Sequence, residues 1–163
     1  MTKPIINIDD LEGSYELKHG DRFEAKLASV GPLIGAKKLG YNLTVVAPGK
    51  RAFPFHNHHA NEEMFMILGG EGTLRFGSEE HPVRAGDIIA CPPGGPEVAH
   101  QLINTGSEEL RYLAVSTLID TDVYQYPDSG KFGASGGRNG ALRDAKFHGF
   151  YDESAKLDYW HGE

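Results

Sequence analysis

Short apolar runs separated by turn-forming residues occupy the middle of the chain. Runs with the character of strands cover residues 43–47, 63–68, 72–76, 82–84, 87–91, 98–104 and 109–117, and glycine, proline or asparagine bounds each of them. Two earlier stretches, residues 5–8 and 22–30, have the pattern of edge strands, and the sequence has no heptad pattern and no internal repeat. Regularly spaced short strands are typical of a β-sandwich or a small barrel, so we predict an all-β fold.

The last part of the chain has a different pattern. Residues 129–140 are rich in glycine, which gives the backbone too much freedom to form a strand in isolation. We therefore expect residues 127–140 to form a mobile flap or connector near the mouth of a cavity, or else a plain surface linker. Residues 141–158 mix aromatic and charged side chains, and Tyr159 and Trp160 lie almost at the end. This aromatic-bearing C-terminal extension, residues 118–163, is expected to pack on the body or on a partner subunit.

The length and composition fit one domain over residues 1–163. Hydrophobic residues make up 39% of the chain beside 21 glycines and nine prolines, and this load of turn formers favours strands over a helical bundle. The formal net charge of −7 argues against nucleic acid or an anionic membrane as the partner, so a small-molecule ligand is expected. The single cysteine, Cys91, excludes an internal disulfide and a cysteine-based zinc module. No apolar stretch has the length of a signal peptide or a membrane span, which predicts a cytoplasmic protein.

Three histidines and one glutamate are spaced as metal ligands. His56 and His58 stand two residues apart, and positions i and i+2 of a strand point to the same face. Both imidazoles can therefore approach one ion, whereas a helix would separate them by about 200°. Glu63 has the opposite parity, so a turn over residues 59–62 has to reset the register before the next strand. His100 is expected to reach the same place from a separate strand.

The two segments that hold these residues resemble the two characteristic motifs of the cupin superfamily. His56, His58, Glu63 and Gly70 fit the first motif, Gly-x5-His-x-His-x3,4-Glu-x6-Gly, and Gly86, Pro92, Gly94, His100 and Asn104 fit the second, Gly-x5-Pro-x-Gly-x2-His-x3-Asn. The chain departs from the motifs twice. Gly49 lies one residue too far from the first histidine, and three extra residues, 95–97, form an inserted loop before the third. The resemblance covers about residues 41–117.

This resemblance implies a double-stranded β-helix, also called a jelly-roll barrel, with one divalent ion held by His56, His58, Glu63 and His100. Three neutral imidazoles and a carboxylate suit Mn, Fe, Ni, Co, Cu or Zn and do not select among them. An octahedral ion held by four protein groups keeps two positions for water or substrate. No catalytic residue is assigned, although Glu97 in the inserted loop is a candidate general base, with a turn-stabilising surface charge as the alternative.

Neighbouring side chains have competing interpretations. Glu62 is the rival of Glu63, and the six-residue gap to Gly70 favours Glu63. We expect Glu62 and His59 to face solvent, Asn104 to make structural hydrogen bonds and Cys91 to be a small buried hydrophobe. The roles of two sets of residues stay open. Phe65, Ile67 and Leu102 either line the cavity or belong to the core. Lys50 and Arg51 either contact an anionic substrate or lie at a solvated strand end.

The resemblance leaves the reaction open, because cupins include dioxygenases, sugar-phosphate isomerases, decarboxylases and storage or sensor proteins. The specific expectation is a metal-dependent isomerase of a sugar or sugar phosphate, and the alternative enzyme is an iron-dependent dioxygenase. Against a phosphate substrate, the two motifs offer no inward-facing arginine or lysine. A non-catalytic protein that uses the metal to hold a small molecule is the alternative of another class. Small cupins commonly pair, so we expect a homodimer that buries N-terminal strands or the Tyr159–Trp160 tail.

Overall fold

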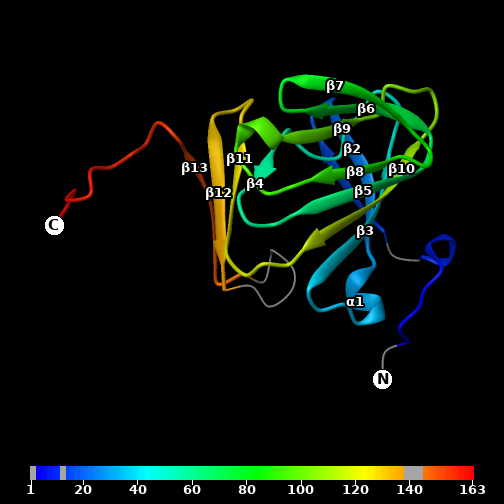
Figure 1. The fold of residues 1–163 in the computed structure, drawn as a ribbon, viewed down its shortest axis with the longest axis horizontal. Helices are drawn as coiled ribbons and strands as arrows, with labels where there is room; N and C mark the ends of the chain where they lie inside the picture. The colour runs from blue at the N-terminus through cyan, green and yellow to red at the C-terminus, as the bar shows by residue number, and fades with distance from the viewer. Residues whose placement is uncertain (1–2, 12–13, 138–144) are drawn as a thin grey trace.

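Two layers of antiparallel strands enclose the core (Figure 1). The computed structural model describes residues 3–11, 14–137 and 145–163. The first layer is a six-stranded sheet in the order β1 (Tyr15–His19), β2 (Phe23–Ser29), β3 (Leu39–Val46), β10 (Leu110–Thr117), β5 (Glu63–Gly69) and β8 (Ile88–Cys91). The short helices of the described residues are η1 (Ile8–Asp10), α1 (Gly31–Ile34) and η2 (Pro96–Val98). None of the helices in this described part is long and apolar enough to cross a membrane.

The second layer is made of two smaller sheets. One has three strands in the order β7 (Glu79–Arg84), β6 (Glu71–Phe76) and β9 (His100–Ile103). The other has four strands in the order β13 (Phe147–Asp152), β12 (Lys131–Gly136), β11 (Asp122–Tyr126) and β4 (Asn57–His58). A backbone bridge between His56 and His100 joins the two sheets where β4 and β9 begin. The all-β jelly-roll prediction is therefore confirmed.

The core lies between the two layers. Along β5, Phe65 and Ile67 are buried while Met66 between them is 38% exposed, as the two-residue period of a strand requires. The six-stranded sheet adds Val46, Leu110 and Tyr112 to this core, and the three-stranded sheet adds Leu74, Val83 and Leu102. Each such side chain contributes about 1.5–3 kcal/mol when it leaves water, so this packing holds the ligand-bearing strands in fixed positions.

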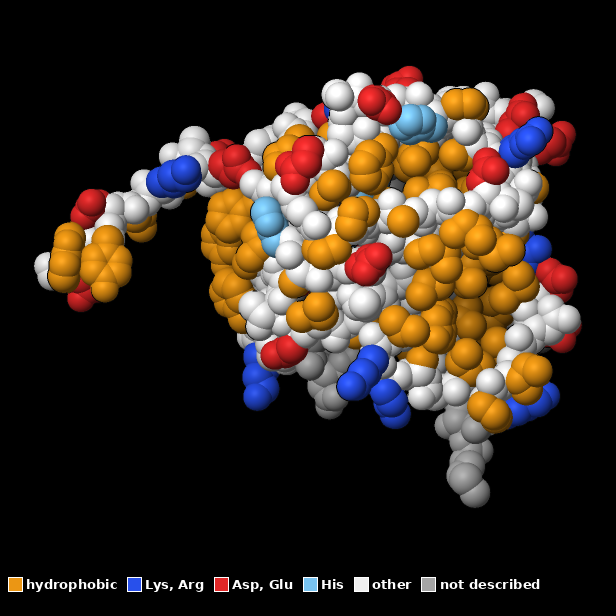
Figure 2. All heavy atoms as spheres, in the orientation of Figure 1, with side chains coloured by type: hydrophobic (Ala, Val, Ile, Leu, Met, Phe, Trp, Pro, Cys, Tyr) orange, Lys and Arg blue, Asp and Glu red, His pale blue; other side chains and the backbone are white. Residues whose placement is uncertain are grey.

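Apolar side chains also cover the outer face of the six-stranded sheet. The register places Leu43, Leu113, Met66 and Ile88 in one row across β3, β10, β5 and β8. Ile88 is 69% exposed at the end of this row. Figure 2 shows hydrophobic side chains gathered over the region of these strands. We call these four residues the outer apolar row.

The glycine-rich segment folds differently from the expectation. Residues 131–136 form β12, which pairs with β11 on one side and β13 on the other, and Ser135 within it is 1% exposed. The prediction of a mobile flap over residues 127–140 is therefore wrong for this stretch, and residues 138–140 lie outside the described residues. Glycine cannot hold a strand by its own side chains, but two hydrogen-bonded neighbours supply the order that isolated glycine lacks.

Two further expectations about the ends of the chain need correction. Residues 5–8 do not form an edge strand, because Ile8 already begins the 3-10 helix η1. Residues 22–30 contain β2, which lies between β1 and β3, so the edge strand on this side is β1, which the sequence pattern did not reveal. The C-terminal tail extends away from the body in Figure 1, and its Leu157, Tyr159 and Trp160 are 72%, 84% and 70% exposed. Packing of this tail on its own body is therefore not observed, and packing on a partner subunit stays a prediction.

Candidate metal centre

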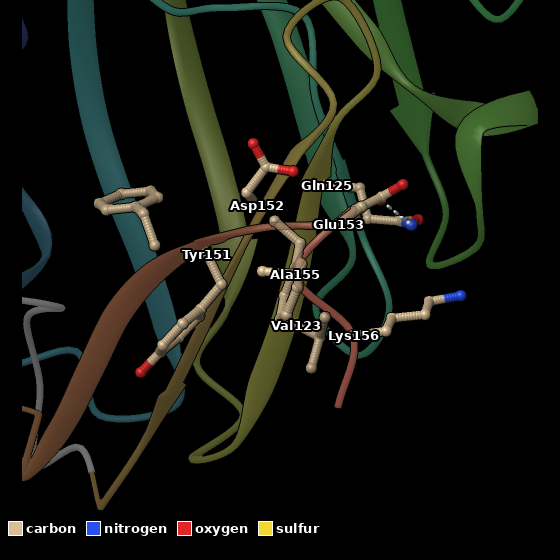
Figure 3. Close-up of a pocket in the computed structure, with 9 residues that line it drawn as sticks. Val123, Gln125, Tyr151, Asp152, Glu153, Ala155 and Lys156 are labelled. Carbon is tan, nitrogen blue, oxygen red and sulfur yellow. Dashed lines mark hydrogen bonds between the residues drawn. The ribbon is translucent and has the colours of Figure 1, made fainter. Parts of the chain in front are cut away.

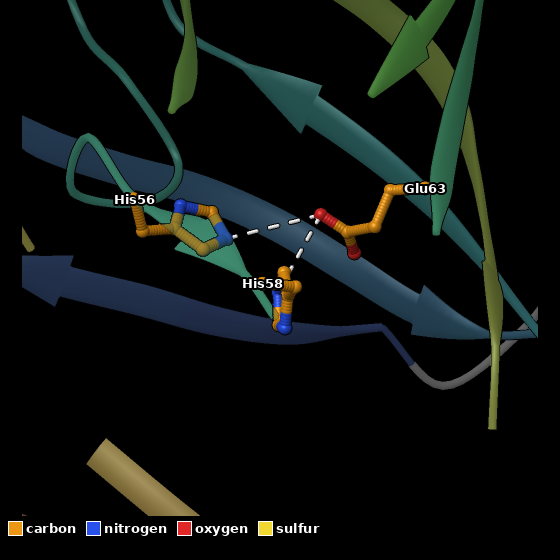
Figure 4. A group of neighbouring side chains, drawn as sticks. All are labelled: His56, His58 and Glu63. Atoms are coloured by element: carbon orange, nitrogen blue, oxygen red, sulfur yellow. Dashed lines mark ion pairs between the residues drawn. The ribbon is translucent and has the colours of Figure 1, made fainter. Parts of the chain in front are cut away.

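Three of the four predicted ligands form one cluster between the two layers. The ligand atoms of His56, His58 and Glu63 lie within 4.8 Å of one another. Figure 4 shows these three side chains pointing toward one another. Glu63 Oε2 lies 3.8 Å from His56 Nε2 and 3.7 Å from His58 Nε2. His100 Nε2 lies 3.0 Å from the same Glu63 oxygen and hydrogen-bonds to it. Three imidazole Nε2 atoms therefore converge on one carboxylate oxygen.

The pairing of the strands explains this convergence. His56 and His100 exchange two backbone hydrogen bonds, with N···O distances of 3.2 and 2.8 Å, so their side chains leave the sheet side by side. His58 is two residues further along and shares their face. Glu63 comes from the opposite layer, at the first position of β5. The turn predicted over residues 59–62 separates β4 from β5 and carries the chain across the core.

All three imidazoles are oriented by a hydrogen bond at their other nitrogen. His56 Nδ1 lies 2.8 Å from the Pro54 carbonyl oxygen, and His100 Nδ1 lies 3.2 Å from that of Val98. His58 Nδ1 lies 2.6 Å from a carboxylate oxygen of Asp122. Since these oxygens only accept, the Nδ1 atoms of His56 and His58 carry the proton and their Nε2 atoms present lone pairs to the cluster. His100 faces an acceptor oxygen at both nitrogens, so it would offer Nε2 to a metal ion only after giving up the proton that it donates to Glu63. Such oriented tautomers are the usual support of metal-ligating histidines.

The charge states of the cluster also suit a metal ion. Burial is the main reason that the pKa of His56 is lowered to about 4, so this imidazole is neutral near pH 7. Burial opposes the ionisation of Glu63, but the hydrogen bond from His100 and the nearby His58 and His56 lower its pKa to about 2. A neutral nitrogen donor and an ionised oxygen donor are the forms that bind divalent transition metals, and these residues therefore fit such an ion. Joint coordination by all four residues stays a prediction.

Asp122 is the site residue that sequence reasoning missed. It lies at the start of β11, more than sixty residues after His58, and is 2% exposed. Besides His58 Nδ1, its carboxylate accepts hydrogen bonds from Asn61 Nδ2 at 2.7 Å and from the Ala60 backbone N–H at 2.9 Å. Burial opposes the ionisation of Asp122, but the bonds from His58 and Asn61 outweigh it and lower the carboxyl pKa. No motif marks this position, because only the pairing of β11 with β4 brings it to the histidine.

Aromatic rings form the walls around the cluster. Tyr126 stacks on His56 with ring centroids 5.9 Å apart and an interplanar angle of 21°. The Tyr124 ring lies 5.8 Å from His58, and the Phe65 ring lies 5.6 Å from His100. Burial is the main cause that raises the pKa of Tyr126 to about 12, so its phenol keeps its proton and can donate a hydrogen bond. Phe65, Ile67 and Leu102, whose roles the sequence left open, all lie in the core, and Phe65 also contacts His100.

Two predicted supporting roles are confirmed. Asn104 is completely buried, and its Nδ2 donates to the carbonyl oxygens of Val46 and Glu108, each at 2.8 Å. Its Oδ1 accepts from the Gly106 N–H at 3.0 Å, so all of its bonds serve the backbone. Cys91 is 1% exposed, and burial raises the pKa of its thiol far above the ordinary value. Both residues are structural.

The remaining candidates lie outside the cluster. Glu62 is exposed, and the exposed His59 has its Nε2 2.8 Å from the amide oxygen of Gln125. Glu97 is also exposed, and its carboxylate accepts a hydrogen bond from the Gly95 N–H at 2.9 Å, which favours the turn-stabilising interpretation over a general base. Lys50 Nζ donates to the Asp21 carbonyl oxygen at 2.6 Å and belongs to the strand-end alternative.

A separate hollow lies between the C-terminal sheet and the beginning of the tail. It has a volume of about 720 Å³ and is shown in Figure 3. Its lining combines strand residues with the beginning of the tail: Val123, Gln125, Phe132, Phe150, Tyr151, Asp152, Glu153, Ala155 and Lys156. None of the four predicted metal ligands lines it, so it is distinct from the metal centre.

Comparisons with known proteins agree with the geometry of the site. Residues 42–116 match the family model described as a cupin domain. Auxin-binding protein 1 of Arabidopsis thaliana is 32% identical over 135 residues, which are 77% of this chain and 65% of that protein. An oxalate-binding protein of Thermotoga maritima is 34% identical over 64 residues, which are 39% of this chain and 50% of that protein. The chain thus matches between half and about two thirds of the length of these curated relatives.

A solved structure extends the likeness to almost the whole chain. A proposed sugar phosphate isomerase from Acidithiobacillus ferrooxidans superposes with a TM-score of 0.81 at 25% sequence identity. The superposition covers 96% of both chains. It therefore includes the C-terminal strands β11 to β13, which lie beyond the region matched by the family model.

Proposed function

This chain belongs to the cupin superfamily, and from that premise we propose that it is a metal-dependent enzyme that isomerises a sugar or a sugar phosphate. The observation that carries the proposal is the convergence of three imidazole Nε2 atoms on the Glu63 carboxylate, with each Nδ1 already bonded to an oxygen. Likeness over 96% of the chain to a proposed sugar phosphate isomerase supports the substrate class.

The proposed ligands are His56, His58, Glu63 and His100, holding one divalent transition metal. When bound, such an ion acts as a Lewis acid that polarises a carbonyl or hydroxyl oxygen of the substrate. The residues of the chain would position the substrate, because the Phe65 and Tyr126 rings flank His100 and His56 and give the site apolar walls. The protonated Tyr126 phenol offers a hydrogen-bond donor to a substrate oxygen beside the ligands.

The decisive experiment is turnover by metal-loaded protein. The purified protein is analysed for its elements, reloaded separately with Mn²⁺, Zn²⁺ or Fe²⁺, and incubated with aldose and ketose sugars and their phosphates. We expect the ratio of aldose to ketose to change with the wild type and not with the His58→Ala variant. Recovery of every sugar unchanged would refute the isomerase. Fe²⁺-dependent O₂ consumption would instead select the alternative dioxygenase.

A non-catalytic binder is the second candidate. It is favoured by the likeness to two proteins that are named as binding proteins, an auxin-binding protein and an oxalate-binding protein. In this function the metal and the aromatic walls grip a small molecule and release it unchanged. Tight binding of a metabolite without turnover, with and without O₂, would support the binder.

A further inference from the structure

We propose that Lys131, Tyr126 and Phe150 form a subsite beside the metal centre that binds the anionic end of the substrate. The ligand class is a small oxygen-rich molecule that carries a phosphate or a carboxylate group. This inference rests on the proposed function for the identity of the metal-bound end, and it adds the group that the cupin motifs lack, an inward-facing cation.

The pairing of β4, β11, β12 and β13 puts these side chains on one face. His58 stands directly opposite Tyr124, and Tyr126 lies two residues further along β11. Tyr126 in turn stands directly opposite Lys131. Directly opposite residues of antiparallel strands share a face, as do residues i and i+2. Lys131 therefore extends the face that carries the metal ligand His58.

Phe150 completes the same face one strand further out. Gly133, two residues after Lys131, stands opposite both Tyr124 on β11 and Phe150 on β13. A side chain at Gly133 would overlap the Tyr124 ring, so glycine leaves room for that ring to lie across β12. The Phe150 ring reaches back to within 6.0 Å of Tyr124 and 5.9 Å of Tyr126. The result is a continuous aromatic surface that starts at His56.

The ammonium group of Lys131 lies above this surface. Its Nζ is 4.9 Å from the Tyr126 ring centroid and 5.7 Å from that of Phe150. The Tyr126 ring is stacked on His56, so the ammonium group and this predicted metal ligand contact the same aromatic ring. In the proposed complex, one small molecule places an oxygen on the metal and its anionic group at this ammonium group.

The charge of Lys131 is not neutralised by a carboxylate in the described part of the chain. Its cross-strand neighbour is Asp152, but one oxygen of that carboxylate accepts from the N–H and the hydroxyl of Ser154, at 2.8 and 2.6 Å. No ion pair to Lys131 occurs among the described residues. The cation is held over aromatic rings and keeps its capacity to bind an anion.

The exposure of Phe150 supports the same conclusion. This ring is 52% exposed although it belongs to a cluster that leads to a buried site. An apolar ring beside a cation complements a substrate whose ring or carbon chain stacks on the phenyl group while its anionic group meets the ammonium. A phosphate and a carboxylate both satisfy this chemistry, and matched probes distinguish them.

The test measures anion preference by calorimetric titration of Mn²⁺-loaded full-length protein. Ribose 5-phosphate is compared with ribose, and galacturonate with galactose, in the wild type and in Lys131→Gln, Lys131→Arg and Phe150→Ala. Lys26→Gln on β2 in the other layer is the matched control. Lys131 and Phe150 are both accessible to solvent, so these variants are expected to fold, and metal content is checked in each.

We expect one charged probe to bind the wild type at least tenfold more tightly than its neutral partner. Lys131→Gln should reduce this preference to less than threefold, while Lys131→Arg and Lys26→Gln keep it. Phe150→Ala should weaken both members of the preferred pair. Which pair shows the preference identifies phosphate or carboxylate. A preference that survives in Lys131→Gln, or no preference in the wild type, overturns the subsite.

Turnover separates this inference from the proposed function. A Lys131-dependent preference without any isomerised product leaves the subsite standing and removes the isomerase. If Lys131→Gln isomerises a charged sugar with the same kcat and KM as the wild type, the isomerase is supported and the subsite is refuted. In the expected result, Lys131→Gln raises KM at least tenfold and changes kcat by less than threefold.

Discussion

Replacement of Asp122 by asparagine tests whether the hydrogen bonds behind the histidines matter for the metal centre. The Asp122 carboxylate accepts from His58 Nδ1, Asn61 Nδ2 and the Ala60 N–H at 2.6, 2.7 and 2.9 Å. An asparagine side chain has only one acceptor oxygen, so its NH₂ group must face at least one of these donors. If the NH₂ faces His58, the imidazole is driven to the tautomer with its proton on Nε2, and the lone pair needed by the metal is lost.

The structure sets the expected size of the effect. Partners that orient metal-ligating histidines typically contribute 10-fold to 100-fold in metal affinity, or about 1.4–2.8 kcal/mol. Because Asp122 is 2% exposed, the unsatisfied donor cannot be repaired by bulk water and costs about 1–3 kcal/mol of metal-free stability. We therefore expect Asp122→Asn to bind Zn²⁺ 10-fold to 100-fold more weakly while it still folds.

The assay is competition between the protein and a chromophoric chelator for Zn²⁺, with urea unfolding of the metal-free proteins alongside. Asp128→Asn is the matched control, because Asp128 is bound to Arg75 at 2.7 and 2.9 Å and touches no metal ligand. Its Zn²⁺ affinity should equal that of the wild type. An Asp122→Asn affinity within twofold of the wild type would show that the orientation of His58 does not depend on this carboxylate.

Three further predictions concern the metal, the core and the assembly. His58→Ala should lower the metal content measured by elemental analysis, whereas His59→Ala should not, and the reverse result would contradict the proposed ligands. Ile67→Ala should lower the free energy of unfolding, measured with urea, by about 2–5 kcal/mol, because this side chain is 1% exposed in the core. Met66→Ala should lower it clearly less, because Met66 is partly exposed, and equal losses would refute the packing argument. The protein should form a homodimer that covers the exposed end of the outer apolar row, Met66 and Ile88, since adjacent exposed apolar residues mark contacts between proteins. Ile88→Lys should shift it toward monomer in light scattering, and a wild type that is monomeric at micromolar concentration would refute the dimer.

Most of the strands and the grouping of His56, His58 and Glu63 could be predicted from the sequence, because both depend on the spacing of residues within short segments. A short apolar run bounded by turn-forming residues marks a strand, and the run from Met64 to Leu68, which ends at two glycines, forms most of β5. The two-residue period of a strand puts His56 and His58 on one face, and the gap to Gly70 selects Glu63 over Glu62. These relations lie within segments of a few residues, so they can be recognised before any tertiary contact is known.

The contributions of the C-terminal strands were decided only by tertiary structure. Asp122 reaches His58 because β11 pairs with β4, across a separation of more than sixty residues. Residues 131–136 form a strand because they pair with β11 and β13, although their glycine content disfavours a strand in isolation. Which distant strands pair depends on the arrangement of all the sheets, so it cannot be predicted from the pattern of residues within one segment. The sequence alone therefore predicted which histidines and glutamate come together, while the fold determined which carboxylate orients His58.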